Sequence, residues 1–159
     1  MTGRDFGNAV VSRWPIVAHE RLLLPHVGRI TRTRRAATAA TLDLAGRTTL
    51  RVYSVHLATI FEIGPGSRAD QLCAVMEDAD RFAAAIIGGD LNSSLVGEVA
   101  EQAGWEWPTS WGASTTLGGR LDHLLLSGLA AVPGRAGVIR DVRGASDHRP
   151  VWVDAVILH

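Results

Sequence analysis

Six side chains of the types used in phosphate chemistry lie within predicted strands or at or near their ends. They are two imidazoles, three carboxylates and one carboxamide: His56, Asp90, Asn92, Asp122, Asp147 and His148. Carboxylate and carboxamide oxygens are hard ligands that suit Mg²⁺ or Mn²⁺. A histidine oriented by an aspartate can donate to a phosphoryl oxygen or exchange a proton near neutral pH. We therefore expect these side chains to converge on one site.

The sequence lacks the motifs of several competing chemistries. It has no Ser-His-Asp nucleophile elbow, no Cys-x-x-Cys pair and no glycine-rich phosphate loop with a lysine. The polar residues that are present favour metal-assisted attack by water over a covalent intermediate.

Asp90 and Asn92 follow an apolar, β-branched run, residues 83–87, that predicts a buried strand. Gly88 and Gly89 are expected to end this strand. A spacing of two in extended backbone points both polar side chains to one side of the strand end, where α/β sheets commonly place their chemistry. The alternative is an ordinary turn, which Asp and Asn also favour.

The remaining pattern predicts an α/β domain with consecutive antiparallel strands in its first part. A helix should begin at an N-cap, Ser67, and end near Phe82, with a weaker one over 96–103. A loop over 104–119 contains Trp105, Trp107 and Trp111, whose packing should anchor it to the core. A turn is expected at 128–133, and strands are expected at 9–12, 17–24, 36–44, 48–56, 120–127, 138–143 and 151–158.

Composition indicates one globular domain over residues 1–159, because 47% of the residues are hydrophobic and 20% are charged. The 16 basic and 16 acidic residues cancel, so no net charge attracts nucleic acid or an anionic membrane. The single cysteine, Cys73, excludes an intrachain disulfide, and no apolar run is long enough to span a membrane. The chain is expected to be soluble, in a compartment that the sequence leaves unknown, with the cytoplasm as the default.

The only basic cluster consists of Arg29, Arg32, Arg34 and Arg35. Two interpretations are open: a contact with nucleic acid, or a solvent-exposed strand or loop. The solvent-exposed strand or loop is favoured, because the chain as a whole is neutral. No role is predicted for His123.

Five motifs in order resemble the endonuclease/exonuclease/phosphatase superfamily, whose members include DNase I and the abasic-site endonucleases. They are the entry strand at 7–16, the Val-Tyr-Ser-Val-His-Leu strand at 52–57, Gly-Gly-Asp-Leu-Asn at 88–92, Arg-Leu-Asp-His at 120–123 and Ser-Asp-His-Arg-Pro-Val at 146–151. The resemblance covers nearly the whole chain. It implies a DNase I-like two-sheet α/β sandwich with the site at one edge of the sheets.

The resemblance also implies a role for each candidate residue. His148 would contact the scissile phosphate, with its ring held by Asp122, and His56 would stabilise the phosphate from the other side. Asp90 would activate or position the attacking water, and Asn92 would support it and the phosphate. Asp90 and Asp147 would be ligands of Mg²⁺ or Mn²⁺.

The function so implied is metal-dependent hydrolysis of phosphate esters, with a phosphodiesterase or nuclease favoured. DNA, RNA, phospholipid and small phosphate esters all remain open as substrates. The alternative is a catalytically weak or inactive truncated homologue that acts as a binding module.

One departure from the family is large. Family members run to roughly 250 residues, near the upper end of ordinary domain size. The missing N-terminal part carries an asparagine and the glutamate that is the principal metal ligand, and Asp5 is the only carboxylate near this end of the chain. The chain is therefore a fragment, a misassigned start or a reduced homologue. Loss of strands should expose a sheet edge and invite self-association.

Overall fold

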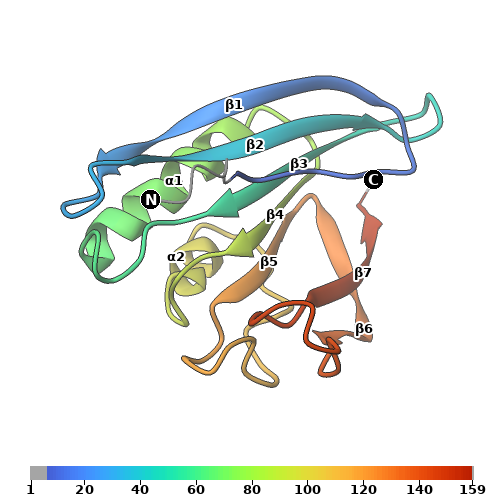
Figure 1. Ribbon diagram of the computed structural model, residues 1–159. Coiled ribbons are helices and arrows are strands. Elements are labelled where there is room, and N and C mark those ends of the chain that lie inside the picture. Colours follow the sequence, from blue (N-terminus) through green and yellow to red (C-terminus); the bar gives the residue numbers. More distant parts are fainter. Residues whose placement is uncertain (1–6, 159) are drawn as a thin grey trace.

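The computed structural model describes residues 7–158, which form two sheets and two helices (Figure 1). Asp5 and His159 lie outside the described residues. The elements, in chain order, are β1 (Ile16–Val27), β2 (Arg34–Asp43), β3 (Thr49–His56), α1 (Pro65–Ala79), β4 (Ala85–Asp90), α2 (Gly97–Gln102), β5 (Asp122–Ser127), β6 (Leu129–Val138) and β7 (Val151–Ile157).

The larger sheet has five strands in the order β1-β2-β3-β4-β5, so its spatial order is its chain order. The pairs β1–β2, β2–β3 and β4–β5 are antiparallel, as expected for the first three strands. The pair β3–β4 is parallel, and α1 makes the long connection that parallel neighbours require. β6 and β7 pair in a separate antiparallel sheet. The predicted two-sheet α/β class is confirmed.

The five-stranded sheet has a hydrophobic core on each of its faces. Leu72 and Val75 of α1 pack with Tyr53, Ile87 and Leu125 of the sheet on one face. The other core joins the sheet to the smaller one and includes Leu42, Leu50, Leu126 and Leu129. Successive residues of a strand point to opposite faces, so each central strand serves both cores. This sheet supports the polar residues at the ends of its strands, which include His56, Asp90 and Asp122.

Two strands continue past the ends that were expected for them, Gly88 for the run at 83–87 and residue 24 for the strand at 17–24. β4 continues through Gly88 and Gly89 to Asp90, because Gly89 (φ +140°) lets β3 lie against it where a Cβ would overlap the carbonyl of Val55. β1 continues through Pro25, and the register of its pairing with β2 shifts there. β1 is an edge strand, where the missing N–H of proline is tolerated.

The turn expected at 128–133 and the strand expected at 138–143 are both wrong. Gly128 (φ +67°) makes the turn by itself, and β6 begins at the next residue and ends at Val138. Pro133 lies within β6, in the interval between Ala131 and Ala136 where the register with β7 shifts. The irregular register accommodates a residue that cannot donate to the ladder.

Three smaller expectations also fail. Residues 9–12 form no strand; the segment is held instead by side-chain bonds, since Asn8 donates to the carbonyl of Ala36 and accepts from Thr38. The N-cap of α1 is Gly64, with Pro65 in the first turn, rather than Ser67. The helix ends at Ala79 rather than near Phe82.

Neither helix in the part of the chain that the structure describes, residues 7–158, has the length and apolar character of a membrane-spanning segment.

Candidate functional site

The sheet register brings three of the six candidate residues into one row. His56 is opposite Asp90 in the β3–β4 ladder, and Asp90 is opposite Asp122 in the β4–β5 ladder. By strand alternation the three side chains lie on the face opposite the helices. His56 Nε2 lies 3.5 Å from Asp90 Oδ2. Three residues separated by 66 positions in the sequence thus form one line across the end of the sheet.

His148 joins this row through Asp122. Its Nδ1 lies 2.8 Å and 3.1 Å from the two carboxylate oxygens of Asp122. The loop between β6 and β7 that carries His148 is held by bonds from the His148 N–H to Ser146 Oγ and from the Arg149 N–H to the carbonyl of Thr115. The imidazole is thereby fixed with Nε2 as its outer nitrogen.

The environment of His148 favours its protonated form. Burial lowers the pKa of His148, but the hydrogen bond with Asp122 and the negative charges of Asp122, Asp90 and Asp147 outweigh it and raise the pKa above its ordinary value. A larger fraction of His148 is therefore cationic near neutral pH. A cationic imidazole can stabilise negative charge on a phosphoryl oxygen.

Asn92 holds the end of β4 in place. Its backbone is left-handed (φ +49°), its N–H donates to Asp90 Oδ1 at 2.9 Å, and its Nδ2 donates to the carbonyl of Leu57 at 2.8 Å. The Leu57 N–H in turn donates to the carbonyl of Asp90. The expected strand-end geometry is therefore replaced by a turn, and this turn orients the carboxylate of Asp90.

Asp90 and His56 are both perturbed toward their neutral forms. Burial raises the pKa of Asp90, against the opposing effects of the Asn92 N–H and the charge of His56. Burial and the positive charge of Arg35 lower the pKa of His56, although Asp90 and Glu62 oppose this. A carboxylate with a raised pKa is a stronger proton acceptor, and a neutral imidazole can exchange a proton. Perturbed groups gathered at a strand end are typical of active sites.

The model of the endonuclease/exonuclease/phosphatase family matches residues 1–148, which include every candidate residue. The chain belongs to this family. Its members are hydrolytic phosphoesterases that generally depend on a divalent metal. None of the curated proteins matches the chain.

Solved structures show the same fold. An endonuclease/exonuclease/phosphatase from Beutenbergia cavernae is 21% identical, with a TM-score of 0.73 over 92% of this chain and 46% of that one. A mannosyl-6-phosphatase from Bacteroides thetaiotaomicron is 19% identical, with a TM-score of 0.70 over 91% of this chain and 67% of that one. TDP2 from D. rerio, complexed with single-strand DNA product, is 17% identical, with a TM-score of 0.67 over 89% and 68%. The chain thus spans about half to two thirds of these structures.

The described residues only partly fit the metal that the family implies. Asp90 offers a carboxylate within the row, but one of its oxygens accepts the Asn92 N–H and the other lies near His56. Asp147 is exposed on the loop beside His148. Within residues 7–158, no group of three or more His, Cys, Asp or Glu side chains could hold a metal ion. These residues therefore do not make a complete metal site by themselves.

Two further charged residues next to His56 were not predicted as site residues. Arg35 and Glu62 both influence the pKa of His56, and they form an ion pair with each other at 2.7 Å. The arginine cluster in the sequence was the one available signal for Arg35, but a solvated role was favoured for it. His123, for which no role was predicted, is fully buried and accepts a hydrogen bond from Trp107 Nε1 at 3.1 Å.

Proposed function

We propose that this chain carries the catalytic centre of a phosphoester hydrolase, with phosphodiesters such as nucleic acids as the favoured substrates. The observation that carries the proposal is the row His56–Asp90–Asp122, with His148 bonded to Asp122. The row unites residues from three strands and one loop, and each member suits hydrolysis by water. Family membership supports the reaction class.

Each side chain has a part in the proposed reaction. Asp90, oriented by the Asn92 N–H, accepts a proton from the attacking water as the water oxygen bonds to phosphorus. His148, held by Asp122, places positive charge against the phosphoryl oxygens as the bond to the leaving oxygen breaks. His56 donates to the phosphate from the opposite end of the row. Asp122 is a positioning residue, because it acts through His148.

Mg²⁺ or Mn²⁺ as cofactor, with Asp90 and Asp147 as ligands, stays a prediction. A divalent ion would neutralise charge on the phosphoryl oxygens and lower the pKa of a bound water. Because the described residues supply an incomplete ligand set, no step above depends on the ion.

The proposal is tested by assaying hydrolysis of plasmid DNA, a lipid phosphodiester, a chromogenic phosphodiester and a chromogenic monoester, with added Mg²⁺ or Mn²⁺. His148→Gln should lower any activity by about 10²–10⁴-fold, as expected for loss of a proton-transfer or charge-stabilising group. Asp154→Asn is the matched control, since Asp154 is exposed on β7 and pairs with Arg135. Hydrolysis that His148→Gln leaves unchanged would overturn the assignment.

The incomplete metal set favours one second candidate, a module that binds phosphate esters without turning them over. Such a module would retain affinity for an oligonucleotide or a phosphate ester while the assays above show no product. Product formation that disappears in His148→Gln would exclude it.

A further inference from the structure

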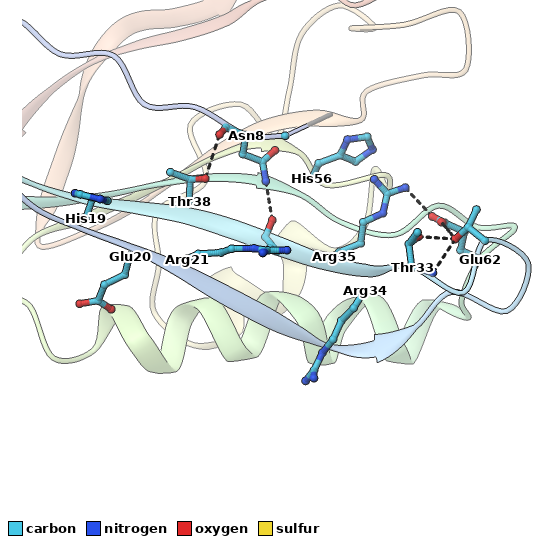
Figure 2. Close-up of a pocket in the computed structure, with 13 residues that line it drawn as sticks. Asn8, His19, Glu20, Arg21, Thr33, Arg34, Arg35, Thr38, His56 and Glu62 are labelled. Atoms are coloured by element: carbon cyan, nitrogen blue, oxygen red, sulfur yellow. Dashed lines mark hydrogen bonds and ion pairs between the residues drawn. The ribbon is translucent and has the colours of Figure 1, made fainter. Parts of the chain in front are cut away.

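A cavity of about 750 Å³ opens over β1 and β2 and extends to His56. Its lining includes Arg35, Glu62, Asn8 and Thr38, so it is polar where it meets the row (Figure 2). Figure 2 shows the side chain of Arg35 directed from β2 toward His56. Arg35 and His56 both line this cavity, and the positive charge of Arg35 helps to lower the pKa of His56.

Glu62 fixes the position of Arg35. The Glu62 carboxylate accepts from Arg35 Nη2 at 2.7 Å, from Thr31 Oγ1 at 2.9 Å and from the Thr59 N–H at 3.0 Å. Burial would raise the pKa of Glu62, but these hydrogen bonds and the charge of Arg35 lower it to about 2. Glu62 is therefore ionised throughout the neutral range and holds one edge of the guanidinium.

The rest of the guanidinium is available for another group. Glu62 accepts from one nitrogen, Nη2, of a group that carries five N–H donors. Arg35 Nε is buried and has no hydrogen-bond partner among the described residues, so the donors left for a ligand in the cavity are those of the terminal nitrogens. The side chain is still 19% exposed, beside the cavity. A fixed cation with spare donors next to a histidine is suited to bind an anion, and the fork of a guanidinium matches phosphate oxygens.

We propose that Arg35 binds a second phosphoryl group, adjacent to the one that reacts at the row. This inference rests on the proposed function and narrows it to substrates with two neighbouring phosphoryl groups. A nucleic acid strand and a pyrophosphate both supply this chemistry. Glu62 is the positioning residue of this second subsite, because it touches Arg35 rather than the ligand.

The first experiment measures the binding of pyrophosphate and of orthophosphate by calorimetry, without divalent metal. Arg35→Gln should weaken pyrophosphate binding by about 10–100-fold, the loss expected for a hydrogen bond between charged groups, and change orthophosphate binding little. Arg35→Lys should recover part of the affinity, since it keeps the charge and loses the fork. The control Arg47→Gln removes an exposed arginine from the β2–β3 turn, at the other end of these strands from His56.

The second experiment compares KM for a trinucleotide, which has two phosphates, with KM for a dinucleotide, which has one. If a nucleic acid strand is the ligand, Arg35→Gln should raise the KM for the trinucleotide and leave the KM for the dinucleotide nearly unchanged. If Arg35→Gln weakens only the binding of pyrophosphate, the subsite is specific for pyrophosphates. If Arg35 had a purely structural role, its substitution would change the affinities for pyrophosphate and orthophosphate alike, and the KM values for trinucleotide and dinucleotide alike. Equal effects within each pair would therefore overturn the inference. So would a wild-type protein that binds neither anion.

The failure of this inference and that of the proposed function can be told apart. If the wild type hydrolyses phosphodiesters but Arg35→Gln shows no loss of discrimination, the second subsite is wrong and the hydrolase stands. If no substrate is hydrolysed but pyrophosphate binding depends on Arg35, the binding site stands and the hydrolase is wrong.

Discussion

Gly89→Ala tests whether the closeness of β3 and β4 holds the row together. Gly89 has φ +140°, a region that residues with a side chain rarely adopt. An added Cβ would overlap the carbonyl oxygen of Val55 and lie only 2.9 Å from its carbonyl carbon. Both atoms belong to the β3 backbone and are one residue before His56, so they cannot move without displacing the row.

The structure gives an approximate magnitude. The unfavourable backbone conformation costs about 1–3 kcal/mol, and overpacking against a fixed backbone costs about 1–3 kcal/mol more. We therefore expect the free energy of unfolding to fall by about 2–6 kcal/mol. For a domain of this size each kcal/mol lowers Tm by about 2–4 °C, so a loss of ~4 kcal/mol corresponds to ~8–16 °C.

The assay is urea and thermal unfolding, with Gly46→Ala as the control. Gly46 also has a positive φ, +70°, but nothing lies within 4 Å of a Cβ added there. Its substitution should cost only the backbone term, about 1–2 kcal/mol. If Gly89→Ala is no less stable than Gly46→Ala, the close approach of β3 and β4 does not constrain the site as we argue.

Three more predictions concern titration and metal binding. Asp122→Asn should lower the pKa of His148, because the mutation removes the negative charge and the charge-assisted hydrogen bond that raise it; NMR titration of the ring measures this pKa. Since the pKa of His148 is higher in the folded than in the unfolded state, the stability that this pair contributes should be fully present below pH ~6.5 and lost as pH rises through the folded pKa. Urea unfolding at several pH values should show this loss in the wild type but not in the mutant. His123 should affect the pH dependence of stability in the opposite direction, because burial lowers its pKa. The free energy of unfolding should decrease as pH falls below ~6.5. This dependence on pH should be weaker in His123→Gln, whatever the mutant's absolute stability. Calorimetry should show only weak Mg²⁺ binding by the 159-residue chain in the absence of substrate, since Asp90 and Asp147 are the main expected ligands; tight binding would contradict this ligand assignment.

Sequence reasoning predicted one contact within the candidate site better than it predicted the boundaries of the elements. The motifs at 120–123 and 146–151 led to the expectation that Asp122 holds His148, and the structure contains this hydrogen bond. The motifs predicted this contact because each short stretch specifies both a strand end and a polar side chain. The turn expected at 128–133 and the strand expected at 138–143 misplaced β6, because the shift in register that accommodates Pro133 depends on pairing with β7.

Arg35 and Glu62 show why other site residues could not be found from sequence. They are 27 positions apart and meet only because the chain after β3 folds back beside β2. Neither residue belongs to a periodic pattern or to one of the five motifs. The buried partners of His123 are similar, since Trp107 lies in a loop whose path is set by packing rather than by local propensity.

Adjacent residues of β5, Asp122 and His123, serve opposite faces of one sheet, and this has a consequence for how the chain tolerates change. A shift of β5 by one residue would carry every side chain of the strand to the other face. The carboxylate would then be buried beside Trp107 while the imidazole entered the row, and burying an unpaired charge is costly. An insertion within β5 is thus opposed by the core as well as by the site. The register of β5 is therefore constrained from both faces of the sheet at once.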